Sequence, residues 1–299
     1  MKQTKTLGII LAICGILLFS SKAVMVKLAY QYDIDSISLL LLRMLFAFPF
    51  YLVVSIVKRP KEKLQSNDYL WLLGLGMVGY YLASYFDFLG LQYIKASLER
   101  LILFIYPTLV LLLSYIFLGK TITKKQALGV IVTYIGVVII FSNELVINQE
   151  DRVLYGAVLI FLSALTYASY LTGSGWLIPK FGATVFTSYA MMISCACVVM
   201  HYIYTKEVSI LSFPAEVYWI GLAMAFFATV IPSYLISYAI KILGANNFSI
   251  FGSLGPVSTI VLAYIFLDEN LTVIQLLGSV VVISGIFIAE KRKKKATAG

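Results

Sequence analysis

The stretch "YIFLGK" runs from Tyr115 to Lys120, and "YIFLDE" runs from Tyr264 to Glu269. Both begin with the same four letters, but one ends in a base and the other in acids. Sliding the sequence by 149 positions (264 − 115) aligns them, and that register continues without a gap for about fifty residues. The matched pairs include Tyr85–Tyr234, Ala96–Ala245, Pro107–Pro256, Thr123–Thr272, Gln126–Gln275, Gly129–Gly278 and Gly136–Gly285. Apolar letters match readily by chance, whereas Pro, Gly and Gln in one register do not. The sequence therefore predicts two repeated halves, 1–148 and 150–299.

The composition places both halves in a membrane. Of 299 residues, 61% are hydrophobic and only 12% are charged, with a mean hydropathy of +0.94. Soluble domains have about 45–50% apolar and about 25% charged residues. A membrane-spanning helix needs about 20 mostly apolar residues. Ten segments meet this requirement, approximately 7–29, 36–57, 69–91, 96–118, 124–142, 153–176, 184–204, 216–239, 246–267 and 272–290. We expect an all-α membrane protein with ten transmembrane helices.

The charges between these segments predict the orientation. With the N-terminus in the cytoplasm, sixteen Lys and Arg residues fall in cytoplasmic segments, and only Lys95, Arg152 and Lys206 fall outside. This distribution follows the positive-inside rule, so both termini are expected in the cytoplasm. The protein itself is expected in the inner membrane of the cell. Five spans per half is an odd number, so the second half enters the membrane inverted. The loop after "YIFL" then changes sides, which explains its opposite charge in the two copies. Inverted repeats are typical of secondary transporters.

The repeated phrase also carries a family resemblance. The half-ending segments "YIFLGKTITKKQALGVIVTYIGV" and "YIFLDENLTVIQLLGSVVVISGI", with ten spans in two halves, resemble the EamA-type transporters of the drug/metabolite transporter superfamily. The resemblance covers about 7–290. It implies a central cavity between spans 1–4 and 6–9, with spans 5 and 10 packed outside it. It also implies export of small compounds, amino acids and other metabolites among them.

Charged residues inside the predicted spans are the first candidates for the binding site, because burying a charge in a bilayer is costly. Lys22, Arg43, Asp87, Glu99 and Arg100 all fall in the outer half of the membrane in the first repeat. The bases are expected to attract a substrate carboxylate, and Asp87 or Glu99 to hold an amine or a coupling proton. Asp87 could instead form a structural ion pair. Glu99 and Arg100 lie about 100° apart around their helix and are not expected to pair.

Neutral polar residues are expected to complete the cavity. The candidates are Tyr81, Tyr85, Tyr170, Ser233, Tyr234 and Asn247. Tyrosine also gathers at membrane interfaces, which is an alternative role for each of the tyrosines. The glycine pairs Gly129–Gly136 and Gly278–Gly285 are spaced by seven residues, so each lies on one helix face. We expect them to serve helix packing.

Several classes of protein are not expected from this sequence. It contains no Walker-type loop, no His-rich metal spacing and no nucleophile elbow, so we expect no enzyme, no metal and no cofactor. No basic stripe suits a nucleic acid. The expected partners are the lipid bilayer and a small-molecule substrate, and a homodimer is left open. The predicted function is secondary transport of small polar metabolites by alternating access. A passive facilitator or channel and a membrane enzyme or lipid-handling protein are the alternatives.

Overall fold

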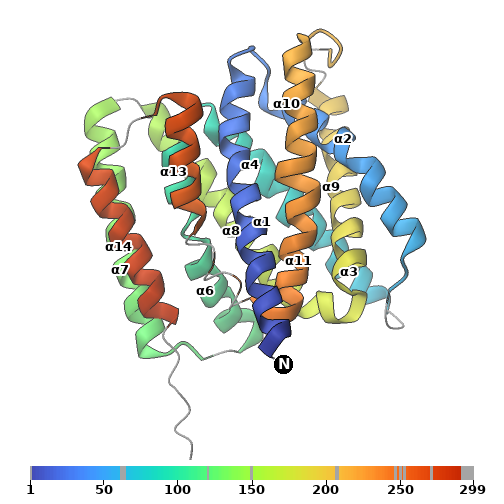
Figure 1. The fold of residues 1–299 in the computed structure, drawn as a ribbon, viewed down its shortest axis with the longest axis horizontal. Coiled ribbons are helices and arrows are strands. Elements are labelled where there is room, and N and C mark those ends of the chain that lie inside the picture. The colour runs from blue at the N-terminus through green and yellow to red at the C-terminus, as the bar shows by residue number, and fades with distance from the viewer. Residues whose placement is uncertain are drawn as a thin grey trace, which may run out of the picture.

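A computed structural model describes residues 2–60, 65–119, 121–148, 151–205, 209–245, 248, 251, 254–269 and 272–290. Within these ranges every regular element is helical (Figure 1). The first half contains α1 (Lys2–Tyr30), α2 (Ser36–Val57), α3 (Ser66–Gly76), η1 (Met77–Leu82), α4 (Ala83–Leu91), α5 (Ala96–Leu103), α6 (Tyr106–Leu118) and α7 (Lys124–Asn148). The second contains α8 (Asp151–Phe181), α9 (Ala183–Thr205), α10 (Ala215–Ala225), η2 (Phe226–Val230), α11 (Ile231–Leu243), α13 (Leu254–Leu267) and α14 (Val273–Glu290).

Seven of the described helical segments are long and apolar enough to cross a bilayer. They are Lys5–Tyr30, Ser36–Val57, Ser66–Leu91, Ala96–Leu118, Arg152–Phe181, Ala183–Thr205 and Ala215–Leu243. These correspond to expected spans 1–4 and 6–8. Shorter apolar stretches, Ala127–Gly136 and Leu276–Gly285, lie within α7 and α14. The expected span 246–267 begins among residues outside the described ranges.

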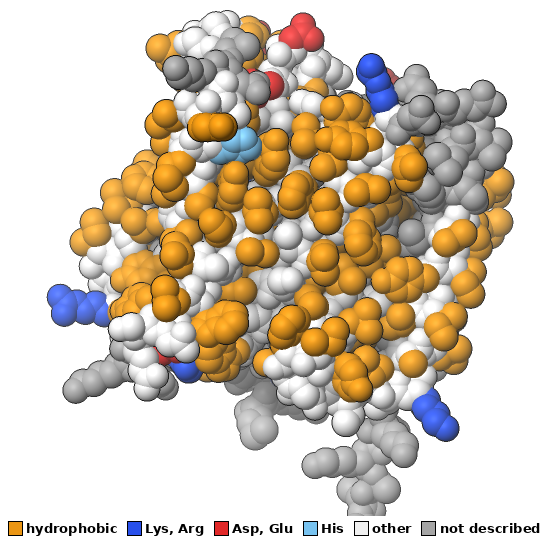
Figure 2. Space-filling view, turned by 180° about the vertical axis from the view of Figure 1, so that it is seen from behind, with side chains coloured by type: hydrophobic (Ala, Val, Ile, Leu, Met, Phe, Trp, Pro, Cys, Tyr) orange, Lys and Arg blue, Asp and Glu red, His pale blue; other side chains and the backbone are white. Residues whose placement is uncertain are grey.

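The outer surface of the bundle is apolar, as a protein dissolved in lipid requires. Figure 2 shows hydrophobic side chains over the middle of one face, with Lys and Arg at its margins. Large side chains such as Phe117 (74% exposed) and Ile203 (64%) point away from the protein. In water such a continuous apolar surface would cause aggregation. The chain is therefore a multi-pass membrane protein.

Irregular backbone recurs at the 149-residue spacing found in the sequence. Two π-helical turns interrupt long helices, and they begin at Met77 and Phe226 (226 − 77 = 149). The helices that carry "YIFL" both end at a residue with positive φ, Gly119 (62°) and Asp268 (53°). These positions are again 149 apart. In Figure 1, α6 lies in the lower part of the molecule and α13 in the upper part, so these two ends lie at opposite ends of the bundle.

The four spaced glycines hold α7 and α14 together, as predicted. A Cβ added at Gly136 would lie 2.8 Å from the Gly278 carbonyl oxygen, and one at Gly285 would lie 2.7 Å from the Gly129 carbonyl oxygen. Only glycine allows two backbones to approach this closely. The contact is reciprocal, because each glycine meets the helix of the other half at the equivalent place. This helix pair stands at one side of the bundle (Figure 1).

Candidate functional site

Five charged side chains from four helices meet inside the bundle. They are Lys22 of α1, Arg43 of α2, Asp87 of α4, and Glu99 and Arg100 of α5, and none exposes more than 5% of its surface. Burying a charge costs several kcal/mol unless an opposite charge or hydrogen bonds compensate it. The contacts of each side chain therefore determine which charges are neutralised within the protein and which are available to a ligand.

Lys22 is neutralised by two carboxylates. Its Nζ lies 2.6 Å from Asp87 Oδ2 and 4.0 Å from Glu99 Oε1. The oxygens of both carboxylates accept no hydrogen bond of regular geometry from any described residue, so the approach is a contact between charges. Two acids thus share one ammonium, and this part of the cluster carries a formal charge of −1.

Glu99 and Arg100 also approach each other, contrary to the expectation from the sequence. Arg100 Nε lies 3.8 Å from Glu99 Oε2. The prediction rested on the angle of about 100° between consecutive residues of a helix. However, every residue of α5 is buried, so both sides of this short helix face the interior. The long Arg100 side chain can therefore reach back towards Glu99.

Arg43 has no carboxylate partner within 4.0 Å among the described residues. Its Nη2 donates a hydrogen bond to Ser84 Oγ at 2.9 Å, and its guanidinium carbon lies 4.8 Å from the centre of the Phe88 ring. Its Nε is buried and donates no hydrogen bond to a described residue. A guanidinium offers five N–H donors. Arg43 is therefore a buried cation, and its Nε–H is not used in a hydrogen bond to any described residue.

Arg100 instead connects three helices. Its Nε donates to Thr259 Oγ1 of α13 at 3.0 Å, and its Nη2 donates to the Phe19 carbonyl of α1 at 3.3 Å. Thr259 Oγ1 in turn donates to the Ser20 carbonyl at 3.1 Å. Thr259 belongs to the second half, and the other three residues belong to the first half. The hydrogen bonds of Arg100 thus join α5 and α1 of the first half to α13 of the second half.

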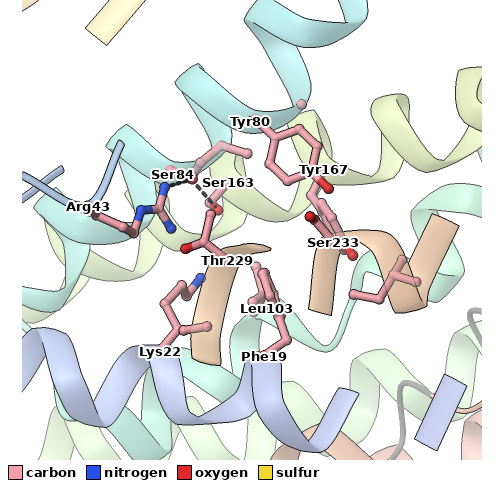
Figure 3. A pocket seen from close by; sticks show the side chains of 14 residues that line it. Phe19, Lys22, Arg43, Tyr80, Ser84, Leu103, Ser163, Tyr167, Thr229 and Ser233 are labelled. Carbon is pink, nitrogen blue, oxygen red and sulfur yellow. Dashed lines mark hydrogen bonds between the residues drawn. The ribbon is translucent and has the colours of Figure 1, made fainter. Parts of the chain in front are cut away.

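A small cavity of about 30 Å³ lies beside Lys22 and Arg43 (Figure 3). Its lining is Phe19, Lys22, Arg43, Gly79, Tyr80, Ala83, Ser84, Leu103, Ser163, Tyr167, Ala228, Thr229, Ser233 and Ile236. Both halves contribute to it, and both π-helical turns do. None of the lining residues comes from α7 or α14. A cavity needs about 10–15 Å³ by this measure to hold one water molecule, so this one has room for about two or three waters, and a metabolite does not fit in this conformation.

A second cavity of about 20 Å³ adjoins the first and contains Arg100. The two cavities share Phe19, Tyr167, Leu103 and Ile236 as lining residues. The Phe19 and Tyr167 rings are stacked, with centres 6.0 Å apart. Lys22 and Arg100 lie over the Phe19 ring at 4.9 and 5.8 Å. An aromatic wall therefore separates the two cavities, with a cation on each side.

Three of the neutral candidates lie in or near the cavity wall. Ser233 lines the first cavity, and its Oγ lies 2.8 Å from the Tyr51 hydroxyl. Tyr170 stands behind the wall, fully buried, with its ring 4.8 Å from that of Tyr80. Tyr234 joins α11 to α9 through a 2.8 Å hydrogen bond with Ser188. Of these three residues, only Ser233 could touch a ligand in the first cavity.

Tyr81 and Tyr85 do not line either cavity. The Tyr81 hydroxyl lies 3.0 Å from His201 Nδ1, and the Tyr85 ring centre lies 4.7 Å from that of His201. All three are only partly buried, which fits the alternative role of tyrosine at a membrane interface. Asn247 lies outside the described residues.

The structure adds cavity residues that the sequence candidates omit, and a helical wheel could have found some of them. On an α-helix, residues three or four apart share a face. Ser84 precedes Asp87 by three residues, and Phe19 precedes Lys22 by three. Tyr85 precedes Asp87 by two, about 200° around the helix. Thr229, by contrast, depends on the π-helical turn, where its Oγ1 donates to the Met224 carbonyl five residues back at 2.9 Å.

Known proteins resemble this chain along nearly its whole length. The sequence profile of the EamA-like transporter family matches residues 6–142 and again 154–290. The chain is similar to YcbK, an uncharacterized transporter of Bacillus subtilis (strain 168), with 30% identity over 301 residues, which cover 96% of this chain and 94% of YcbK. An uncharacterized transporter of Archaeoglobus fulgidus is 28% identical over 246 residues, covering 82% of this chain and 84% of the relative.

A solved crystal structure shares the fold. Its TM-score with this chain is 0.69 at 16% sequence identity, and the match covers 96% of this chain and 98% of the other. At this identity the similarity concerns the arrangement of helices alone.

Proposed function

The chain belongs to the EamA-like transporter family. We propose that it is a secondary transporter that exports a small polar metabolite across the inner membrane. The proposed substrate carries a carboxylate, and amino acids are the leading candidates. The observation that carries this proposal is the buried Arg43 guanidinium. It faces a cavity between the two halves and has no carboxylate partner among the described residues. A substrate carboxylate would supply the missing charge and accept the unused N–H donors.

The cluster next to Arg43 also offers two carboxylates to the ammonium of a zwitterionic substrate. Lys22, Asp87 and Glu99 together carry a formal charge of −1, which Arg100 balances at 3.8 Å from Glu99, whereas Arg43 carries +1 without a carboxylate partner among the described residues. An amino acid placed between them would direct its carboxylate to Arg43 and its ammonium towards Asp87 or Glu99. The hydroxyls of Ser84, Thr229 and Ser233 would bind its remaining polar atoms.

The proposed architecture is a ten-span bundle of two inverted five-helix units, 1–148 and 150–299. The recurrence of the π-helical turns and of the positive-φ residues at the 149-residue spacing supports it. The reciprocal contact of α7 with α14 is a second support. The excess of bases at the expected cytoplasmic side favours cytoplasmic termini.

The size of the cavity favours a carrier over a permanently open channel on the same scaffold. A space of about 30 Å³ holds no metabolite, so a substrate can enter and leave only after the helices rearrange. Alternating access of one central site, by movement of one half against the other, supplies such a rearrangement.

Counterflow in proteoliposomes would test the function. Vesicles preloaded with one unlabelled compound from a panel of amino acids, nucleosides and sugars would receive the same compound in labelled form. We expect saturable accumulation for a carboxylate-bearing compound and none for its methyl ester. Flux that rises linearly with concentration, or exchange of the ester at the same rate, would contradict the proposal.

Variants of Arg43 would test the site itself. Arg43→Gln should raise the half-saturation concentration about tenfold to hundredfold, the effect of losing a charged hydrogen bond. Arg43→Lys should fall between this variant and the wild type, because it keeps the charge but not the planar fork. Lys58→Gln is the matched control, since Lys58 is an exposed base just beyond α2. Equal kinetics in Arg43→Gln and Lys58→Gln would exclude Arg43 from the site.

A further inference from the structure

Glu269 connects the two halves at the end of the bundle opposite the N-terminus, here called the far end. Glu269 follows α13, but its carboxylate binds the first turn of α5. Oε1 accepts from the Ala96 N–H at 3.0 Å, and Oε2 accepts from the Ser97 N–H at 3.0 Å and from Ser97 Oγ at 2.7 Å. These three hydrogen bonds are charge-assisted, and a carboxylate at a helix N-terminus is also favoured by the helix dipole.

The α5 helix depends on this contact for its cap. A side-chain cap must accept hydrogen bonds from the first N–H groups of a helix. The residue before α5 is Lys95, and an ammonium has no acceptor. The cap therefore comes from a residue that lies more than 170 positions away in sequence and belongs to the other half.

Local backbone geometry directs Glu269 to this place. Asp268 ends α13 with a φ of 53°, in the left-handed region that reverses the chain direction after a helix. The equivalent residue, Gly119, ends α6 in the same way. The next residue differs, because the sequence there has Lys120 where the second half has Glu269. A lysine accepts no hydrogen bond, so the opposite end of the bundle cannot form the same cap from this position.

The cap lies at the top of the seam that leads to the charged cluster. Glu99 and Arg100 follow within the same short helix, α5, as the capped residues Ala96 and Ser97. Further inside, Arg100 donates to Thr259 of α13, and Thr259 donates to the Ser20 carbonyl of α1. The seam between α1, α5 and α13 is therefore held at two levels. The upper level is the Glu269 cap, and the lower level is the Arg100–Thr259–Ser20 chain.

We propose that Glu269 is the far-end latch of this transporter, a positioning residue that keeps α13 on α5 while the far side is closed and that leaves α5 when the far side opens. The proposal rests on the transport function proposed above. It assigns the two ends different closing contacts, because only the far end has a carboxylate at the loop after "YIFL".

Cysteine labelling would test the latch without any substrate, so its outcome is independent of which compound is transported. Cys14, Cys195 and Cys197 would be replaced by alanine, and Ser20→Cys would serve as the reporter in the seam. Ser20 is fully buried and lines the second cavity. A membrane-impermeant thiol reagent would be added to each side in turn. A second variant of the same cysteine-free protein would carry Leu211→Cys as a reference for access from the far side. Leu211 is 83% exposed in the loop before α10.

In the Glu269→Gln variant we expect the reagent to label the Ser20→Cys reporter about fivefold faster or more from the far side. A factor of five corresponds to about 1 kcal/mol. The labelling rate from the opposite side should not change. Asp268→Asn is the matched control, because it removes one negative charge from the same loop and asparagine accepts the same backbone conformation. It should label as the wild type does. Ser97→Ala, which removes one of the three hydrogen bonds, should give an intermediate rate and replaces Glu269→Gln if that variant does not fold.

Two results would overturn the latch. Equal labelling of Glu269→Gln and Asp268→Asn would show that the cap does not hold the far side closed. Faster labelling from both sides would show general loosening of the bundle and not the release of one end.

Discussion

Arg43 and Lys22 show how far sequence reasoning reaches at the level of single residues. Both stood out because charges within apolar segments are rare and costly. Their partners could not be assigned in this way. Which carboxylate meets Lys22 depends on the rotation of each helix and on how α5 enters the bundle. Among the described residues, Lys22 meets two acids, whereas Arg43 donates one hydrogen bond, to a serine, so only Lys22 of these two cations is compensated by carboxylates there.

The Lys22–Asp87 pair should stabilise the protein only as a pair. Lys22→Met leaves Asp87 and Glu99 buried without the ammonium between them, and breaking such a pair costs about 3–5 kcal/mol. We expect the Tm in detergent to fall by about 5–10 °C. The double variant Lys22→Met with Asp87→Asn removes both charges and should recover at least half of this loss. A double variant less stable than Lys22→Met would mean that Asp87 is compensated elsewhere.

At the level of elements, the sequence predicted helices better than the breaks between and within them. The expected segments 36–57 and 96–118 coincide with Ser36–Val57 and Ala96–Leu118, because charged and turn-forming residues bound these apolar runs. The π-helical turns at Met77 and Phe226 were not predicted. A π-turn adds a residue to a helix without a distinctive composition, so no periodicity indicates it. These turns contribute Gly79, Tyr80, Ala228 and Thr229 to the cavity, so the missed elements are the ones that shape the site.

The glycine contact of α7 with α14 gives a prediction at this level. A side chain at Gly136 would meet the Val282 backbone nitrogen at 2.7 Å and the Gly278 oxygen at 2.8 Å. Backbone atoms cannot yield locally, so Gly136→Leu must push the two helices apart. Overpacking costs about 1–3 kcal/mol, and we expect a Tm lower by about 5 °C.

Gly74→Ala is the matched control for this substitution. Nothing lies within 4 Å of a Cβ built at Gly74 in α3. Alanine is also the better helix former, so the Tm should stay unchanged or rise. A fall of equal size in both variants would mean that the loss at Gly136 does not come from the helix contact.

For the whole molecule, the 149-residue register predicts a difference between its two ends. The two helices that carry "YIFL", α6 and α13, occupy the lower and upper parts of the bundle in Figure 1. The sequence predicts this inversion from the odd number of spans in each half, and a basic loop in one half that matches an acidic loop in the other agrees with it. It could not anticipate that the acidic loop also caps α5, because that contact joins residues far apart in the chain.

Reporter fusions would test this prediction. We expect alkaline phosphatase to be inactive when fused after Lys120 and active when fused after Glu269, because the enzyme folds only outside the cytoplasm. Green fluorescent protein should give the opposite pattern. Both reporters giving the same result at the two positions would refute the inversion of the second half.

The reciprocal glycine contact has one more consequence. Gly136 meets α14 just as Gly285 meets α7, so each half carries both surfaces that the contact needs. Two separate polypeptides made from a single gene, inserted in opposite directions, could dock through the same four glycines. In a single chain the two copies can differ at equivalent positions, as Lys120 and Glu269 do in the loops after "YIFL".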